Sequence, residues 1–145
     1  LDIVEKHRLP IVLPLHPRTS KMMNKLLSKN LLDQIEACEL IRIIPPTSFL
    51  DIIALEKNCR VVITDSGGVQ KEAYFFKKPC VILRPQTEWI EIVETGSAVI
   101  ADANQEKIVG AVNEFLSSKE LSFPPVFGDG RAAEFIVDEL VKKLN

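Results

Sequence analysis

The chain has 145 residues, of which 46% are hydrophobic and 26% charged, and its formal net charge at pH 7 is −2. This length suits one domain with a full hydrophobic core. The charge is balanced and no basic face or run is present, which argues against a nucleic-acid-binding protein. The apolar stretches are short and interrupted by charge or proline, so we expect no transmembrane helix and no membrane partner.

The first ten residues, LDIVEKHRLP, begin without methionine and have the pattern of the end of a helix. We therefore expect the chain to be a piece of a longer protein. Its three cysteines, Cys38, Cys59 and Cys80, are widely spaced and form no CxxC pair. This usage favours a reducing compartment, the cytoplasm, over a disulfide framework. Cys80 lies in an apolar run and is expected in the core.

Short β-branched runs recur along the chain, and segments with helical spacing separate them. The predicted strands lie at 11–15, 40–44, 60–65, 80–84 and 97–101, and the predicted helices at 19–28, 48–57, 68–76, 89–94, about 104–116 and 131–143. Continuous apolar runs are typical of parallel strands buried on both faces. Alternation of strand and helix predicts βαβ units with right-handed crossovers, so the expected fold class is α/β with a doubly wound parallel sheet.

The ends of several predicted helices carry recognisable signals. Ser48 followed by Asp51 fits a capping box, Asn104 is a favourable N-cap, and Gly96 is a natural C-terminal stop. The segment 122–130 holds two prolines and two glycines and is predicted to be a loop that leads to the last helix.

Polar side chains follow four of the predicted strands at the point where each strand ends. They are His16 and Arg18, then the segment 45–49, then 65–68, then 84–88. In a parallel α/β sheet, ligands bind beyond the carboxyl ends of the strands. The sequence therefore predicts a ligand site at this edge.

Ser66, Gly67 and Gly68 stand between a predicted strand and a predicted helix. A helix N-terminus offers free N–H groups and the positive end of the helix dipole, and glycine lets a phosphate approach the backbone. A plain strand-to-helix turn explains the glycines equally well, because short glycine motifs are common. The stretch is neither a P-loop nor a GxGxxG fingerprint, so it does not predict an ATP or dinucleotide site of those kinds.

Five further residues each allow a binding role and a structural one. Glu72 could accept hydrogen bonds from the vicinal hydroxyls of a ribose, or simply be an acid near a helix N-terminus. His16 could contact a phosphate or only a structural partner, and Arg18 and Arg84 are either phosphate donors or ordinary surface arginines. Phe49 could stack on a base or pack in the core.

No nucleophile–base pair, metal-ligand cluster or paired carboxylate stands out in the sequence, so we expect no metal site. The pattern predicts an α/β domain with an anion site and does not name a reaction.

Taken together, the motifs resemble a known family over nearly the whole chain. They are PLHPRT at 14–19, PP-S-F at 45–49, VITDSGGVQKEA at 62–73, KPCVILRPQTEWIE at 78–91 and GDGRAAEFIV at 128–137. In order and spacing they are similar to the carboxyl-terminal half of non-hydrolysing UDP-N-acetylglucosamine 2-epimerases.

The resemblance implies a fold of two Rossmann-like domains of the GT-B type, with the nucleotide sugar between them, and residues 1–145 as the second domain. It implies that Ser66, Gly67 and Gly68 bind the phosphates and that Glu72 binds the ribose hydroxyls. His16 would lie near the diphosphate as the catalytic residue of this half, with Arg18 and Arg84 as further UDP contacts and Phe49 beside the uracil.

The family reaction inverts carbon 2 of the sugar: UDP is eliminated to give a 2-acetamidoglucal, and it is added back after carbon 2 is reprotonated on the other face. The resemblance implies no cofactor, a homodimer in the full-length protein, and catalytic carboxylates in an amino-terminal domain that is absent here. The isolated chain is therefore expected to be inactive. The sequence differs from the family pattern at Trp89, where an arginine is usual, and at Lys71, where an acid is common.

Two alternatives remain open at this point. One is the donor-binding domain of a GT-B glycosyltransferase, which shares the fold and a phosphate-binding helix. The other is an α/β module without catalytic function, in which Ser66-Gly67-Gly68 is a plain turn.

Overall fold

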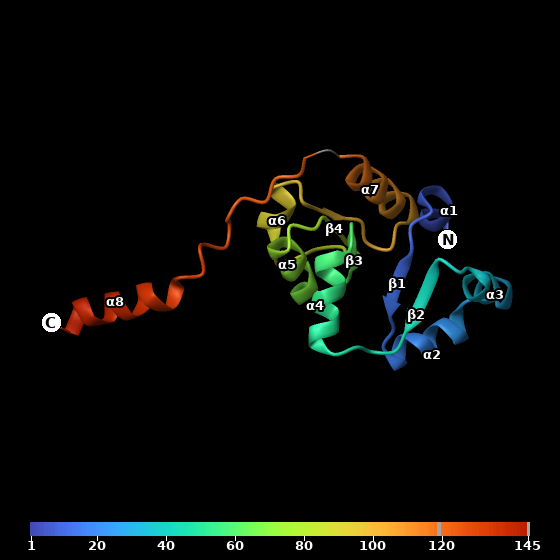
Figure 1. Cartoon of the computed structure of the whole chain (residues 1–145), viewed down its shortest axis with the longest axis horizontal. Helices are drawn as coiled ribbons and strands as arrows, with labels where there is room; N and C mark the ends of the chain where they lie inside the picture. The colour runs from blue at the N-terminus through green and yellow to red at the C-terminus, as the bar shows by residue number, and fades with distance from the viewer. Residues whose placement is uncertain (119, 145) are drawn as a thin grey trace.

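The computed structural model describes residues 1–118 and 120–144 (Figure 1). The strands are β1 (Ile11–Pro14), β2 (Ile41–Ile44), β3 (Val62–Thr64), β4 (Cys80–Ile82) and β5 (Ala98–Ile100). The helices are α1 (Asp2–His7), α2 (Pro17–Leu26), α3 (Lys29–Ala37), α4 (Phe49–Asn58), α5 (Gly67–Phe75), α6 (Ile90–Glu94), α7 (Gln105–Ser117) and α8 (Ala132–Leu144). All strand pairs are parallel, which confirms the predicted α/β class.

The hydrophobic core surrounds a three-stranded sheet in the order β3-β4-β5. The central strand β4 has no exposed residue, because both of its edges are hydrogen-bonded and both of its faces are covered. Cys80 and Ile82 face one side and pack with residues of α5 and α6, including Tyr74 and Ile92. Val81 faces the other side and packs with residues of α7. The predicted burial of Cys80 is confirmed, with 1% of its surface exposed.

A second sheet contains only β1 and β2. In both of its strands the burial pattern shows two exposed residues between two half-buried ones. The predicted α/β class is confirmed, and all five predicted strands form. The strands do not share one sheet, however, because their hydrogen bonds divide them into two sheets. Each strand of a two-stranded sheet is an edge, which explains why its apolar side chains stay partly exposed.

The helices agree with the predicted pattern except in two places. The segment 29–37 was not expected to be helical, and it forms α3, which begins after the N-cap Ser28. Helix α2 begins at Pro17 rather than at residue 19, because proline fits the first helical position. The predicted signals at Ser48, Asn104 and Gly96 are confirmed: both caps accept a backbone N–H, and Gly96 has a φ of 75°.

The amino-terminal helix α1 lies against α7, and α8 projects away from the rest of the chain at the end of an extended segment (Figure 1). His7 hydrogen-bonds Asn113, and Gln105 donates to the Asp2 carboxylate at 2.7 Å, which ties α1 to α7. Helix α8 has no buried residue. In the described part of the chain, no helix combines the length and hydropathy needed to cross a membrane.

Candidate ligand site at the carboxyl ends of β3 and β4

The register of the central sheet brings two of the predicted segments together. Thr64, the last residue of β3, is paired with Ile82, the last residue of β4. Since the strands are parallel neighbours, Ser66 and Arg84 emerge two residues later at the same edge of the sheet. The Thr64 hydroxyl accepts the backbone N–H of Ser66 at 3.0 Å, which shapes the entry to α5.

The N-terminus of α5 is not closed by its own cap. Ser66 is at the N-cap position, yet its side chain makes no capping hydrogen bond with any described residue. Gly67 and Gly68 do not adopt a positive φ, in contrast to Gly96, Gly128 and Gly130. The turn itself therefore does not require glycine.

The room available for a side chain differs between Gly67 and Gly68. A Cβ atom on Gly68 would meet only the Ser66 hydroxyl, at 3.9 Å, which is an ordinary contact. A Cβ atom on Gly67 would come within 3.3 Å of a Glu88 oxygen, 3.7 Å of the Trp89 indole nitrogen and 3.8 Å of an Arg84 guanidinium nitrogen. The side chains that follow β4 thus lie directly against the first turn of α5.

The segment after β4 is held in place by several hydrogen bonds. Trp89 donates its indole N–H to the Gly67 carbonyl oxygen at 2.8 Å. The Thr87 hydroxyl donates to Oε1 of the fully buried Gln70 at 2.6 Å and accepts the backbone N–H of Trp89 at 3.1 Å. These bonds attach residues 87–89 to α5, so the two sides of the site form one rigid unit.

Arg84 and Glu88 form a two-pronged ion pair at this edge. The guanidinium donates to both carboxylate oxygens, at 3.0 and 2.8 Å. The hydrogen bond from Arg84 lowers the pKa of Glu88, and the same bond raises the pKa of Arg84. Because the side chains are 31% and 56% exposed, solvent screens the attraction and the pair can open at little cost.

Glu72 lies on α5 one turn beyond Gly68 and on the same side of the helix, since residues four apart share a face. It is half-buried. A second carboxyl, that of Glu56, approaches from α4: burial first, and then the charge and hydrogen bonding of Glu72, raise the pKa of Glu56 from 4.5 to about 7. This pair could not be predicted from the sequence, because the two acids are distant in the chain.

His16 and Arg18 follow β1 of the two-stranded sheet, and Phe49 begins α4. Among the described residues, no hydrogen bond or ion pair joins these three side chains to α5. His16 is the N-cap of α2, and its Nδ1 accepts the backbone N–H of Arg18 at 3.2 Å. Phe49 begins α4 and is 66% exposed, so it does not pack in the core. All three are open to a ligand.

Trp89 and Glu88 are the contacts that the sequence did not predict. Trp89 packs edge-on against Phe127. Its hydrogen bond to Gly67 depends on how the loop after β4 folds back over α5. No spacing in the sequence could indicate that contact.

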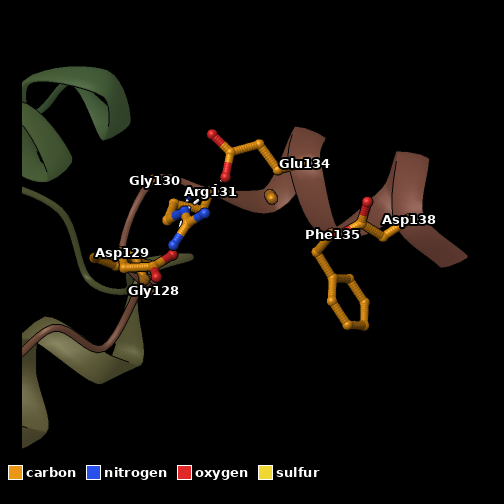
Figure 2. A pocket seen from close by; sticks show the side chains of 9 residues that line it. Gly128, Asp129, Gly130, Arg131, Glu134, Phe135 and Asp138 are labelled. Atoms are coloured by element: carbon orange, nitrogen blue, oxygen red, sulfur yellow. Dashed lines mark hydrogen bonds and ion pairs between the residues drawn. The ribbon is translucent and has the colours of Figure 1, made fainter.

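A hollow of about 550 Å³ lies elsewhere, between the loop 127–131 and the first turns of α8 (Figure 2). Its polar contacts are internal: the Arg131 backbone donates to Asp129 at 3.0 Å, and the Arg131 side chain donates to Glu134 at 2.6 Å. None of the predicted site residues lines it. Within the described ranges, no group of three or more His, Cys, Asp or Glu side chains has the arrangement of a metal site.

The sequence matches a known family and several of its curated members. The sequence profile of the UDP-N-acetylglucosamine 2-epimerase family matches residues 1–141. A UDP-N-acetylglucosamine 2-epimerase of Methanocaldococcus jannaschii is 39% identical over 136 residues, which are 94% of this chain and 36% of the relative. A UDP-2,3-diacetamido-2,3-dideoxy-D-glucuronate 2-epimerase of Pseudomonas aeruginosa is 38% identical over 142 residues, 98% of this chain and 38% of the relative.

Solved structures agree in fold. The UDP-GlcNAc 2-epimerase of Methanocaldococcus jannaschii superposes with a TM-score of 0.83 at 39% identity, over 97% of this chain and 38% of that one. A structure of the enzyme from the same organism in complex with UDP-GlcNAc and UDP superposes with a TM-score of 0.79. The chain spans little more than a third of the length of these relatives and matches part of their GT-B-like fold. The chain belongs to the UDP-N-acetylglucosamine 2-epimerase family.

Proposed function

We propose that this chain is the UDP-binding, carboxyl-terminal domain of a two-domain, non-hydrolysing UDP-N-acetylglucosamine 2-epimerase, an isomerase that interconverts UDP-GlcNAc and UDP-ManNAc. Family membership and the share of the relatives that the chain spans support this assignment. The two relatives named above differ in their sugar and share UDP. UDP binding is therefore the function that the matched third of the protein supports best.

The observation that carries the proposal is the open N-terminus of α5. Gly67 and Gly68 are not needed for the backbone conformation of the turn, and the Ser66 hydroxyl is not used as a cap. A glycine pair at a free helix N-terminus lets a diphosphate reach the N–H groups and the positive end of the dipole. This favours a phosphate site over a plain turn.

The direction of α5 indicates where the ribose and the uracil of UDP would lie. With the diphosphate at Ser66, Gly67 and Gly68, the ribose would lie beside Glu72, one turn along the same face. An ionised carboxylate accepts hydrogen bonds from both vicinal hydroxyls. Phe49, which is exposed at the start of α4, is available to stack on the uracil.

In the proposed reaction the diphosphate is first a leaving group and then a nucleophile. Elimination breaks the bond between carbon 1 and the diphosphate oxygen and removes the proton from carbon 2. Carbon 2 then receives a proton on its opposite face, and the diphosphate oxygen bonds carbon 1 again on the original face. The N–H groups of α5 and the guanidinium of Arg84 would stabilise the charge on departing UDP. Arg84 becomes available when the diphosphate replaces Glu88 in the ion pair.

His16 and Arg18 would approach the diphosphate from the other side. Because Nδ1 of His16 accepts the backbone N–H of Arg18, the neutral ring carries its proton on Nε2. That N–H can donate to a phosphate oxygen, and Arg18 adds a second donor. The chemistry of this half needs no cofactor and no metal.

The carboxylates that move the proton at carbon 2 would come from the amino-terminal domain. We therefore expect no epimerase activity from these 145 residues alone.

In the full-length protein we propose a homodimer in the cytoplasm. Detection of 2-acetamidoglucal released by the full-length enzyme would establish the elimination step. Turnover by the isolated chain would contradict the proposal that the catalytic carboxylates belong to the amino-terminal domain.

A titration of the chain with UDP, followed by amide NMR shifts, tests the binding site. We expect shifts centred on residues 66–72, lost in Glu72→Ala and retained in the matched control Glu106→Ala, whose acid is exposed on α7. Gly68→Ala distinguishes a phosphate turn from a plain one, because the added methyl fits the free structure. Unchanged UDP binding by Gly68→Ala would contradict the proposal. If the chain alone binds no UDP at millimolar concentration, UDP binding is measured with the same variants of the full-length protein, and the same outcomes apply.

A further inference from the structure

Glu56 is a buried acid on α4. It lies near the carboxyl end of α4, which packs against α5, and only 5% of its surface is exposed. Neither carboxyl oxygen has a hydrogen-bond partner among the described residues. A buried, unpaired carboxylate is strongly unfavourable, and proteins normally pair such a group or keep it neutral.

Glu72 is the group that can satisfy it. Two ionised carboxylates offer only acceptors to each other, so no bond forms between them until one carries a proton. With one proton, the pair forms a strong O–H···O⁻ hydrogen bond. Glu56 is buried whereas Glu72 is only half-buried, so Glu56 is the member that holds the proton. In agreement, burial first, and then the charge and hydrogen bonding of Glu72, raise the pKa of Glu56 to about 7.

We propose that Glu56 is a positioning residue for the proposed ribose-binding acid: its neutral carboxyl donates to the Glu72 carboxylate and holds that side chain where the hydroxyls of a nucleoside diphosphate would meet it. This inference rests on the proposed function, in which Glu72 receives the ribose. The shared proton also leaves the pair with a single negative charge, so the second Glu72 oxygen stays available for the ligand.

The other titratable groups around Glu56 do not replace Glu72 as its partner. Cys59, at the C-cap of α4, donates its thiol to the Glu56 backbone carbonyl at 3.2 Å rather than to the carboxyl. Burial raises the pKa of the Cys59 and Cys80 thiols, so both stay protonated at neutral pH. Lys78 lies near Cys59, where it lowers the thiol pKa, and it forms no ion pair with Glu56 in the part of the chain that the structure describes.

The proposal gives UDP binding a defined pH dependence. Below about pH 7 the pair shares its proton and Glu72 is held. Above that pH, Glu56 ionises and the two like charges repel, which displaces Glu72 from the ribose position. UDP affinity should therefore fall as the pH rises from 6 to 8.5.

The test combines two measurements on the chain with ¹³C-labelled glutamate carboxyls. Without UDP, we expect the Glu56 and Glu72 resonances to move together near pH 7, and the Glu72 step to vanish in Glu56→Gln. With UDP, Glu56→Gln should bind as tightly as the native chain at pH 6 and lose the pH dependence, because its amide donates at every pH. Glu56→Ala should bind about tenfold more weakly, as for loss of one hydrogen bond to a charged group. Thermal melts establish that each variant is folded.

Each outcome decides between the alternatives. The terminal phosphate of UDP has a pKa of about 6, so the ligand itself contributes to the pH dependence of the affinity. The pH dependence that remains in Glu56→Gln measures this contribution. A Glu72 resonance that does not respond near pH 7 overturns the shared proton. Coupled titration without a pH effect on UDP affinity, or Glu56→Gln binding as weakly as Glu56→Ala, overturns the positioning role. The carboxyl titration needs no UDP, so coupled titration in a protein that binds no UDP, alone or at full length, would mean that the proposed function has failed.

Discussion

The two sheets of this protein begin from similar sequences and end in different surroundings. Strand β1 reads IVLP and β4 reads CVI, and both are nearly continuous in apolar residues. Yet β4 is fully buried between two strands and two layers of helices, while β1 leaves Val12 and Leu13 40% and 36% exposed beside a single partner strand. An apolar run therefore predicts a strand, and the number of neighbours determines its burial.

The same division appears in the proposed site. Ser66, Gly67, Arg84, Glu88 and Trp89 gather around one helix end at the three-stranded sheet. His16 and Arg18 stand on the two-stranded side, exposed and held only by a local bond between them. One half of the site is rigid, and the other half is open to a ligand.

The largest expected effect comes from truncating equivalent isoleucines in the two sheets. Ile82 is fully buried and Ile43 is 44% exposed. We expect Ile82→Ala to lower the free energy of unfolding by about 2–5 kcal/mol, because it leaves a cavity. Ile43→Ala should cost less than about 1 kcal/mol. Urea denaturation of both variants measures the difference, and equal losses would show that the β1–β2 sheet is covered in solution.

The next effect is a pH dependence of stability that belongs to the buried half. Between the ordinary pKa of 4.5 and the folded value of about 7, native Glu56 holds a proton that the unfolded chain releases. Stability is therefore lost as pH rises through this window, by about 1–2 kcal/mol after allowance for solvent screening. Glu56→Gln should remove the loss, and the control Glu36→Gln, an exposed acid on α3, should retain it. Parallel pH curves for native protein and Glu56→Gln would contradict this assignment.

Removing a helix cap should have different consequences in the two halves. Asn104 accepts the Lys107 N–H at 2.9 Å at the start of α7, whose apolar face lies in the core. Asn104→Ala should lower global stability by about 1 kcal/mol. Ser28 caps α3, which has no buried residue, so Ser28→Ala should increase local hydrogen exchange in α3 with little change in global unfolding. Equal global losses would show that α3 unfolds together with the core.

The smallest effect on stability, and a useful one for function, concerns the ion pair at α5. Glu88→Gln should leave the free energy of unfolding almost unchanged, because exposed pairs contribute little. It should strengthen UDP binding a few-fold at low salt by releasing Arg84. The control is Glu134→Gln, which breaks the exposed pair with Arg131 outside the site. Calorimetric titration compares them; weaker UDP binding by Glu88→Gln would mean that Glu88 itself contributes to the site.

Much of this architecture follows from the sequence, because the signals involved are local. All five predicted strands are present, the caps at Ser48 and Asn104 form, and Gly96 ends α6 in the left-handed conformation. The motif TDSGGVQKEA lies where a strand meets a helix, as predicted, and the family resemblance is confirmed. Helix α3 was not predicted from the sequence.

What the sequence by itself determined is thus the order of the strands and of most helices, the α/β class, the family and the strand ends that carry the polar residues. Only the tertiary structure decided that the strands divide into two sheets, that Trp89 closes on Gly67, and that Glu56 approaches Glu72. These contacts join segments far apart in the chain, so they depend on packing and on desolvation. A pattern of neighbouring residues cannot encode them.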